Sequence, residues 1–359
     1  MTTAHFHPLA VRDVRRETGD CVSFGLEIPP ALEELFRHTQ GQYLNVRRRL
    51  GGEELRRSYS ICSGADDREL RIAVKAVPEG KFSSWANSEL KAGDTLEAMP
   101  PEGRFFAPLD PANAKHYAAF AAGSGITPVL SLVKTTLARE PRSRFTLVYG
   151  NRTLDSVIFN EALEDLKDKH LARLALYHVF SREPQQIELF NGRLDRAKVA
   201  QFLRTLIPPG TIDEAFVCGP DPMMADVEAE LLAAGLPRER IHLERFGVPA
   251  PRPGAVASTK EARASGASEV TVIVDGLRYR FALAGDGPSV LEAALKAGAD
   301  LPYACKAGVC CTCRAKLVEG EVRMDANYTL EADEVARGFR LACQSHPLTR
   351  TLVLDFDQR

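Results

Sequence analysis

The stretch 301–313 reads LPYACKAGVCCTC, and its cysteines decide how the rest of the chain is interpreted. Cys305, Cys310 and Cys313 are spaced C-x4-C-x2-C, and Cys343 follows thirty residues later. Four thiolates in this order are the ligands of a plant-type [2Fe–2S] cluster, two on each iron. The alternatives are a zinc site, which favours two C-x2-C pairs, and scattered core cysteines. We therefore predict a one-electron [2Fe–2S] centre, which must receive its electrons from a preceding cofactor.

The composition is that of a globular protein with several domains. The 359 residues are 45% hydrophobic and 26% charged, and this length predicts two or three domains. A net charge of −2 without a basic stripe argues against nucleic-acid binding, and no apolar run approaches the roughly 20 residues of a membrane span. The start, Met1–His5, lacks a secretory signal. Because Cys21, Cys62 and Cys218 lie far apart, we expect a reducing, cytoplasmic location.

Residues 1–110 have the pattern of a small antiparallel β-barrel. Short runs of alternating apolar and polar residues are separated by turns rich in glycine and proline, and one helix is expected near 82–90. The expected strands lie at 9–12, 21–26, 43–46, 70–74 and 95–98.

Two short motifs in this barrel have residue types that suit a flavin. Arg57-Ser58-Tyr59-Ser60 offers a guanidinium for a phosphate, a phenol ring for stacking and a hydroxyl for a ring nitrogen. An ordinary strand with a half-buried Tyr59 is the alternative. The segment 80–84, GKFSS, opens the expected helix, whose free N–H groups can bind an anion. Its alternative is N-capping of that helix by Ser83 or Ser84.

Residues 111–247 alternate between strand and helix, the pattern of an open parallel α/β sheet. The first strand runs into Gly123-Ser124-Gly125-Ile126-Thr127-Pro128 at the start of a helix. Glycines there let the backbone approach a pyrophosphate, and the helix N-terminus favours its charge, although the third glycine of the usual fingerprint is missing. Strands are expected at 117–122, 145–149, 174–179 and 215–218, and further helices near 159–168, 196–204 and 221–234.

Two more strand ends of this sheet carry candidate ligands of a nicotinamide dinucleotide. Ser181-Arg182 follows a strand where ribose selectivity is commonly set, and a cation beside a hydroxyl fits a 2′-phosphate. This pair predicts NADPH over NADH, although the neighbouring Glu183 weakens the prediction. Arg193 either assists or forms a surface salt bridge. Cys218-Gly219-Pro220 closes another strand, and Gly219 there lets a ligand approach. The alternative for Cys218 is a small core residue.

The C-terminal part divides into a linker and a third domain. Residues 248–268 are poor in large apolar side chains and rich in Ala, Ser and Gly, which is typical of a flexible linker. A hairpin around Asp275-Gly276 then opens a domain at 269–359. A helix at 289–297 leads into the cysteine loop, and strands are expected at 315–320 and 351–356.

In their order along the chain, the motifs at 57–60, 80–84, 123–128 and 218–220 resemble those of the ferredoxin–NADP⁺ reductase family, and the last ninety residues resemble a plant-type ferredoxin. The segments 242–246 (HLERF), 303–313 and 324–330 (MDANYTL) are similar to the reductase subunits of phenylacetyl-CoA ring-epoxidizing monooxygenases. This resemblance implies an antiparallel FAD-binding β-barrel at 1–110, an α/β NAD(P)-binding domain with an open parallel sheet at 111–247, and an α+β, β-grasp ferredoxin domain at 269–359.

The resemblance also implies roles for single residues. Arg57 would pair with the flavin phosphates, Tyr59 would stack on the isoalloxazine, and Ser60 would hydrogen-bond near its reactive nitrogen. Cys218 would lie close to the nicotinamide, and no residue is expected to act as an acid or base. The candidate ligands of FAD and NADPH are Arg57, Ser58, Tyr59, Ser60, Lys75, Gly80, Phe82, Ser83, Ser84, Gly123, Gly125, Thr127, Pro128, Ser181, Arg182, Cys218, Gly219 and Phe246.

Two positions depart from the family pattern. The family often has a second glycine where Glu79 or Lys81 stands. Family members that end at the nicotinamide domain place a terminal aromatic residue over the flavin, whereas Phe246 is followed here by the linker. The first departure lies at the helix start that would meet the flavin pyrophosphate, and the second concerns the aromatic residue that would gate the nicotinamide.

The three cofactors together predict a function. NADPH gives two electrons as a hydride and the cluster takes one at a time, so a flavin must lie between them. We expect an NADPH-dependent oxidoreductase that passes electrons through FAD and the cluster to the oxygenase component of a multicomponent monooxygenase, most specifically the phenylacetyl-CoA epoxidase of phenylacetate degradation. The alternatives are a reductase for another ring oxygenase, a hydroxylase or a desaturase, and a redox-sensing iron–sulfur protein.

Overall fold

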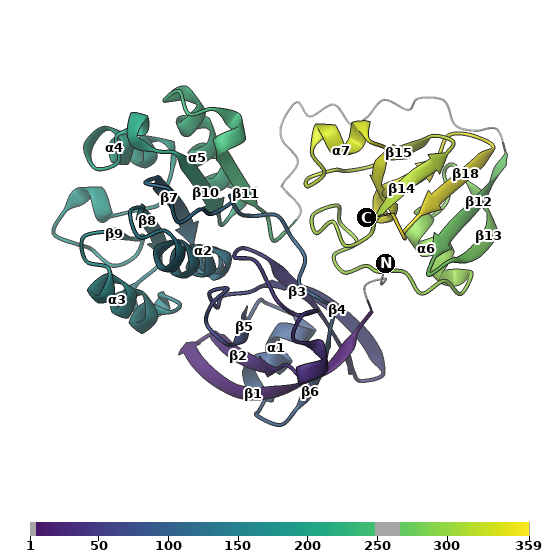
Figure 1. Cartoon of the computed structure of the whole chain (residues 1–359), viewed down its shortest axis with the longest axis horizontal. Coiled ribbons are helices and arrows are strands. Elements are labelled where there is room, and N and C mark those ends of the chain that lie inside the picture. Colours follow the sequence, from purple (N-terminus) through teal and green to yellow (C-terminus); the bar gives the residue numbers. More distant parts are fainter. Residues whose placement is uncertain (1–4, 248–265, 359) are drawn as a thin grey trace. The chain divides into compact units, whose positions relative to one another are not determined.

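The computed structural model describes residues 5–247 and 266–358, which are drawn in colour in Figure 1. They form two compact units, of which the larger comprises residues 8–55 and 59–245 and the smaller contains the C-terminal part of the chain. None of the helices among the described residues has the length and apolar character needed to cross a membrane. The predicted linker at 248–268 lies outside the described residues as far as residue 265.

The first sheet of the larger unit has six strands in the order β4-β3-β6-β1-β2-β5 (Figure 1). The pairs β1–β2, β2–β5 and β3–β6 are antiparallel, and a bridge between Ile61 and Ile72 joins the two ends of the sheet into a barrel. Phe24, Leu44 and Ile72 lie in its core. The elements are β1 (His7–Thr18), β2 (Cys21–Glu27), β3 (Tyr43–Leu50), β4 (Glu53–Ser60), β5 (Leu70–Lys75), α1 (Lys81–Ser88) and β6 (Thr95–Ala98).

The second sheet has five parallel strands in the order β11-β10-β7-β8-β9. The chain runs from β7 outward to β9 and then returns to β10 on the other side of β7. The switch point of the sheet therefore lies between β7 and β10, where open α/β sheets bind their ligands. The elements are β7 (His116–Ala122), α2 (Ile126–Arg139), β8 (Arg144–Asn151), α3 (Asn160–Lys169), β9 (Leu174–Phe180), α4 (Arg196–Thr205), β10 (Glu214–Cys218), α5 (Asp221–Ala233) and β11 (Ile241–Glu244).

The smaller unit has a mixed sheet in the order β13-β12-β18-β14-β16, with a parallel pair, β12–β18, inside it. Helix α6 covers a core that includes Val272, Leu291 and Leu354 and the candidate ligands Cys313 and Cys343. The elements are β12 (Ala267–Val274), β13 (Leu277–Ala284), α6 (Val290–Lys296), β14 (Arg314–Glu319), β15 (Val322–Met324), α7 (Ala332–Ala336), β16 (Phe339–Leu341), β17 (Ser345–Pro347) and β18 (Thr351–Asp355).

The predicted fold class is confirmed, and several local predictions need correction. Helix α1 begins at Lys81, and Gly80 is its N-cap without any side-chain hydrogen bond, so neither serine of the motif caps it. Strand β12 begins at Ala267, which lies inside the predicted linker. Sequence patterns did not reveal β11, β15, β16, β17 or α7, because elements of three to five residues are too short to display a period.

Candidate functional site

The loop after β7 and the end of β10 meet at the switch point of the parallel sheet. A β-carbon at Gly125 would lie 2.0 Å from the carbonyl oxygen of Cys218, so only glycine fits there. The first turn of α2 follows directly, with the N–H of Ile126 bonded back to the carbonyls of Gly123 and Ser124, and the positive end of the helix dipole at this point suits a phosphate. The structure therefore brings together two of the predicted nucleotide-binding motifs at one end of the sheet.

Two hydrogen bonds hold the shape of this loop. The buried Tyr149 of β8 donates its phenol O–H to the carbonyl of Gly123 at 2.9 Å, and Gly123 has a left-handed φ of 53°. The hydroxyl of Thr127 donates to the carbonyl of Ser124 at 3.0 Å. Pro128 is buried in the first turn of α2. The predicted roles of Thr127 and Pro128 toward NADPH stay predictions, and Tyr149 is an unpredicted support of the loop.

Cys218 and Gly219 form the other wall of the switch point. Burial raises the pKa of the Cys218 thiol well above its usual value, so the sulfur carries its proton at neutral pH. A β-carbon at Gly219 would lie 2.9 Å from Cε of Met223 and 3.2 Å from the backbone nitrogen of Ala122. Cys218 is fully buried in the core beside this sheet, which supports the alternative of a core residue, and its contact with the nicotinamide stays a prediction.

Glu244 is a residue of this edge that sequence reasoning missed. It ends β11 and pairs in register with Cys218, and burial raises the pKa of its carboxyl group to about 8. The carboxyl group is therefore mainly protonated at pH 7 and can donate a hydrogen bond. Its neighbour Arg245 is ion-paired with Asp221, and the predicted ligand Phe246 is 51% exposed. The register of β10 and β11, which reveals Glu244, cannot be read from the sequence.

Arginines gather at the ends of β8 and β9. The backbone N–H of Arg182 donates to the carbonyl of Arg152 at 2.9 Å, which places the two residues side by side. Gly192, just before Arg193, donates to the carbonyl of Phe180 at the end of β9. Among the described residues, none of these three exposed guanidinium groups has a hydrogen-bond or ion-pair partner. The exposed Ser181 lies at the same edge, and Arg152 is a further candidate that the sequence did not single out.

The carboxylate of Glu183, the acidic residue beside these arginines, is engaged by the backbone. It accepts the N–H of Leu154 at 2.7 Å and so is bound to the turn after β8. The carboxylate keeps its charge, and it stands against three exposed guanidinium groups at this edge. The edge formed by Arg152, Ser181, Arg182 and Arg193 is therefore suited to an anion.

Strand β4 presents the predicted flavin residues. Arg57 donates from Nη1 to the carbonyl of Arg56 at 2.7 Å, and Ser60 is buried at the end of the strand. The ring of Tyr59 lies 5.5 Å from that of Phe82, which is itself fully buried in the barrel core. Phe82 therefore packs against the ring of Tyr59 within the barrel core, and its predicted contact with a cofactor stays a prediction. Ser58 is half-buried, and all flavin contacts stay predictions.

The start of α1 and the end of β5 contain the remaining barrel candidates. Gly80 is tightly packed, since a β-carbon there would lie 2.4 Å from Oγ of Ser83. That hydroxyl accepts the N–H of Val77 at 3.2 Å and donates to the carbonyl of Gly80 at 3.1 Å, whereas Ser84 is exposed. Ser84 is thus the more accessible of the two predicted pyrophosphate ligands. Lys75 forms an ion pair with Asp20 at 3.4 Å.

The four predicted cluster ligands form two pairs. The side chains of Cys305 and Cys310 are hydrogen-bonded to each other, and so are those of Cys313 and Cys343. Within the part of the chain that the structure describes, no three His, Cys, Asp or Glu side chains converge as ligands of one metal ion. A [2Fe–2S] cluster takes two thiolates on each iron, which is the arrangement of the two cysteine pairs. The residues present therefore fit the binuclear cluster.

One thiol of each pair is more acidic than its partner, since the pKa values of Cys305 and Cys343 are lowered and those of Cys310 and Cys313 are raised. The hydrogen bond from Cys310 lowers the pKa of the Cys305 thiol to about 5, and the backbone N–H of Ala307 donates to the same sulfur at 3.3 Å. A thiolate is the form that binds iron. Cys311, beside Cys310, instead lies 3.1 Å from the hydroxyl of Thr329 and has a left-handed φ of 56°. These contacts assign Cys311 to the support of the loop.

A barrel with a flavin-type motif, a parallel sheet with a dinucleotide loop at its switch point, and a mixed-sheet domain with paired thiols define a class of electron-transfer reductases. Three domain families match this chain. They are the oxidoreductase FAD-binding domain at residues 8–106, the oxidoreductase NAD-binding domain at 120–229, and the 2Fe-2S iron-sulfur cluster binding domain at 272–348.

Relatives match over the full length. The chain is 46% identical to a subunit of the 1,2-phenylacetyl-CoA epoxidase of Escherichia coli (strain K12), over 100% of this chain and 99% of that protein. It is 33% identical to the ferredoxin reductase component of 3-ketosteroid-9-alpha-monooxygenase of Rhodococcus rhodochrous, over 97% and 96% of the two chains. The solved structure of phthalate dioxygenase reductase matches this chain over 98% of each of the two chains, with 25% identity and a TM-score of 0.59.

The chain belongs to the family of ferredoxin–NADP⁺ reductase-type oxygenase reductases that carry a fused [2Fe–2S] ferredoxin domain. It is an oxidoreductase that transfers electrons between a nicotinamide coenzyme, a flavin and an iron–sulfur cluster. The predicted FAD-binding, NAD-binding and cluster-binding domains are thereby confirmed, while the residue-level contacts remain predictions.

Proposed function

We propose that this chain is the NADPH-dependent reductase component of a phenylacetyl-CoA epoxidase. When bound, FAD takes a hydride from NADPH and the [2Fe–2S] cluster delivers the electrons singly to the oxygenase component. The residues bind and orient these groups. The loop Gly123–Thr127 and the start of α2 hold the coenzyme phosphates, strand β4 holds the flavin, and Cys305, Cys310, Cys313 and Cys343 hold the irons. A cytoplasmic location agrees with eight free thiols.

The observation that carries the choice of partner is the 46% identity to the epoxidase subunit over essentially the full length of both chains. The reductase components of 3-ketosteroid and glycine betaine monooxygenases are less similar, at 33% and 31%. A reductase for another oxygenase is therefore the second candidate function. The redox-sensing alternative receives no support from any relative described above.

The partner is tested by reconstitution. The purified chain, NADPH and the phenylacetyl-CoA epoxidase oxygenase subunits of the same host should convert phenylacetyl-CoA, and NADPH consumption should match product formation. The control omits the oxygenase and retains ferricyanide as acceptor. Rapid ferricyanide reduction without any modified CoA ester would show that the chain is a reductase with a different partner.

The choice of NADPH over NADH is tested at the edge formed by Arg152, Ser181, Arg182 and Arg193. Replacing Arg182 by alanine removes a guanidinium that would bind the 2′-phosphate, and a hydrogen bond to a charged group is worth about 1.5–3 kcal/mol. We expect kcat/KM for NADPH to fall roughly 10- to 100-fold by that conversion, while kcat/KM for NADH changes little. Arg204→Ala, at an exposed arginine of α4, is the control. Equal losses with both coenzymes would contradict a 2′-phosphate site.

A further inference from the structure

The loop that joins β4 to β5, residues 61–69, is hydrogen-bonded to helix α2. The hydroxyl of Ser131 donates to the carbonyl of Ser63 at 2.7 Å, and the backbone N–H of Ala65 donates to the hydroxyl of Thr135 at 3.0 Å. Ser131 and Thr135 are one helical turn apart and fully buried. Leaving a buried polar group without a hydrogen-bond partner destabilises the fold. These two bonds therefore define where the loop lies on the helix.

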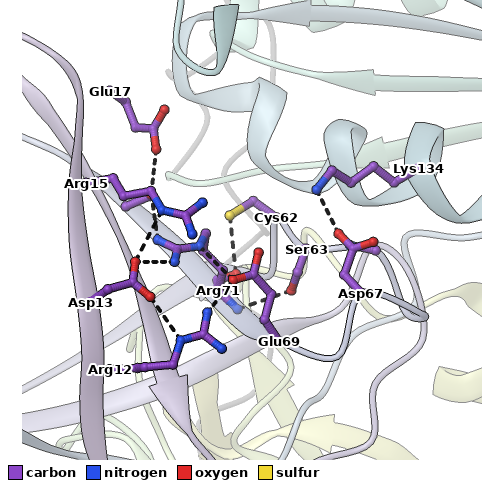
Figure 2. A network of polar contacts seen from close by, with 12 residues as sticks. Arg12, Asp13, Arg15, Glu17, Cys62, Ser63, Asp67, Glu69, Arg71 and Lys134 are labelled. Atoms are coloured by element: carbon purple, nitrogen blue, oxygen red, sulfur yellow. Dashed lines mark hydrogen bonds and ion pairs between the residues drawn. The ribbon is translucent and has the colours of Figure 1, made fainter. Parts of the chain in front are cut away.

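Two ion pairs continue the contact along the same helix. Lys134 donates to Asp67 at 2.7 Å, and Figure 2 shows this lysine extending from the helix toward the loop. Arg139 makes two bonds of 2.8 Å to the carboxylate of Asp66. The side chains of this second pair are 44% and 50% exposed, so it adds little to the free energy of the contact. The buried hydroxyls are thus the decisive part.

The other side of the loop is fixed to the barrel. The backbone N–H of Cys62 donates to the carbonyl of Arg71 at 2.9 Å, and the N–H of Arg71 donates to the hydroxyl of Ser63 at 3.1 Å. The buried guanidinium of Arg71 is bound in turn by Asp13 and by Glu69, as Figure 2 shows. The loop is therefore bonded to the barrel on one side and to α2 on the other.

Both ends of this connection lie close to the predicted cofactor contacts. Ser60, the candidate contact of the flavin's reactive nitrogen, precedes Ser63 by three residues. Thr127, in the coenzyme loop, precedes Ser131 by four residues, which is about 6 Å along a helix. A shift of the loop on the helix would therefore change the distance between the flavin strand and the start of α2 almost directly.

We propose that Ser131 and Thr135 are positioning residues, which set the geometry between bound nicotinamide and flavin by fixing α2 to the loop after β4. The inference rests on the proposed function, in which the chain reduces its flavin with NADPH. Hydride transfer requires the reacting atoms to approach to about 3–3.5 Å, and a displacement of 1 Å can cost roughly 10²-fold in rate. Groups that fix this distance thus control the rate without touching either cofactor.

The test compares two substitutions at one position. Thr135→Val has nearly the same shape but leaves the N–H of Ala65 without its acceptor, whereas Thr135→Ser keeps the hydroxyl. We expect flavin reduction by saturating NADPH, measured by stopped flow, to be about 10-fold slower in Thr135→Val and within about twofold of wild type in Thr135→Ser. Bound flavin per chain and its visible spectrum should be equal in all three proteins.

A second measurement does not depend on turnover. In the oxidised holoenzyme without coenzyme, hydrogen exchange of residues 61–69 should be faster in Thr135→Val than in wild type or Thr135→Ser. Arg139→Ala, which removes only the exposed pair, should leave the rate of flavin reduction within about twofold of wild type. Ser131→Ala removes the other buried bond and repeats the test if Thr135→Val fails to fold.

Three outcomes are decisive. Wild-type rates of flavin reduction in both Thr135→Val and Ser131→Ala would overturn the positioning role. A slow rate accompanied by loss of bound flavin would also overturn it, since the hydroxyl would then support the flavin site itself. A wild-type protein whose flavin is reduced by neither NADPH nor NADH would instead overturn the proposed function.

Discussion

Replacing Cys305 by alanine is expected to abolish the visible absorption of the cluster and all electron delivery to the oxygenase. Cys305 is the thiol whose pKa the hydrogen bond from Cys310 lowers to about 5, so its loss removes a ready thiolate and breaks one of the two sulfur pairs. Reduction of ferricyanide by NADPH should survive, because this acceptor can take electrons from the flavin without the cluster. Iron content, the visible spectrum and the two activities measure the result.

The adjacent cysteine provides the matched control. Cys311→Ala removes a thiol from the same loop without removing a predicted ligand. Because cysteine and alanine both carry a β-carbon, the left-handed φ of 56° at this position is strained to the same extent in both proteins. Loss of the Cys311 thiol removes the contact with Thr329. We expect an unchanged spectrum and unchanged delivery. A bleached spectrum in Cys311→Ala would show that the ligands are misassigned, and loss of ferricyanide reduction in Cys305→Ala would place the cluster upstream of the flavin or show that its domain is needed for folding.

The sequence predicted best those features whose chemistry is local. The spacing of Cys305, Cys310 and Cys313 carries its own meaning, since a cluster needs these thiols in this order. The alternating patterns also located the barrel and the parallel sheet, because apolar periodicity directly reflects which face is buried. The loop Gly123–Pro128 was recognised despite a missing glycine, because its glycines stand between an expected strand and an expected helix.

The features that the sequence did not predict depend on contacts between distant segments. Glu244 is recognised as a residue of the site only because it pairs with Cys218 in an edge strand of four residues. Arg152 lies beside Arg182 only because β8 and β9 end side by side. Thr135 looks like an ordinary helical residue until the loop 61–69 is found on its helix, seventy residues away in sequence. Pattern reasoning sees which face a residue occupies, whereas these roles depend on which other segment covers that face.

Replacing Gly125 by alanine is expected to reduce kcat/KM for NADPH at least about 100-fold. The new β-carbon would lie 2.0 Å from the carbonyl oxygen and 2.5 Å from the carbonyl carbon of Cys218, and 2.9 Å from the nitrogen of Gly219. All three atoms belong to the backbone of the β10 end, which no rotamer change can relieve. The start of α2 must therefore move away from β10, and the coenzyme phosphates move with it.

Substitution of a second glycine in the same loop tests whether the loss of activity comes from this clash or from any change in the loop. A β-carbon at Gly123 meets no described atom within 4 Å, so Gly123→Ala adds only the strain of a left-handed φ of 53°, about 1–2 kcal/mol. We expect a loss of about tenfold in kcat/KM there, with unchanged flavin and cluster spectra in both variants. Reduction of the flavin by dithionite, which needs no coenzyme site, should be unaffected in both. Equal activity of Gly125→Ala and Gly123→Ala would mean that the close approach of α2 to β10 is not needed to bind NADPH.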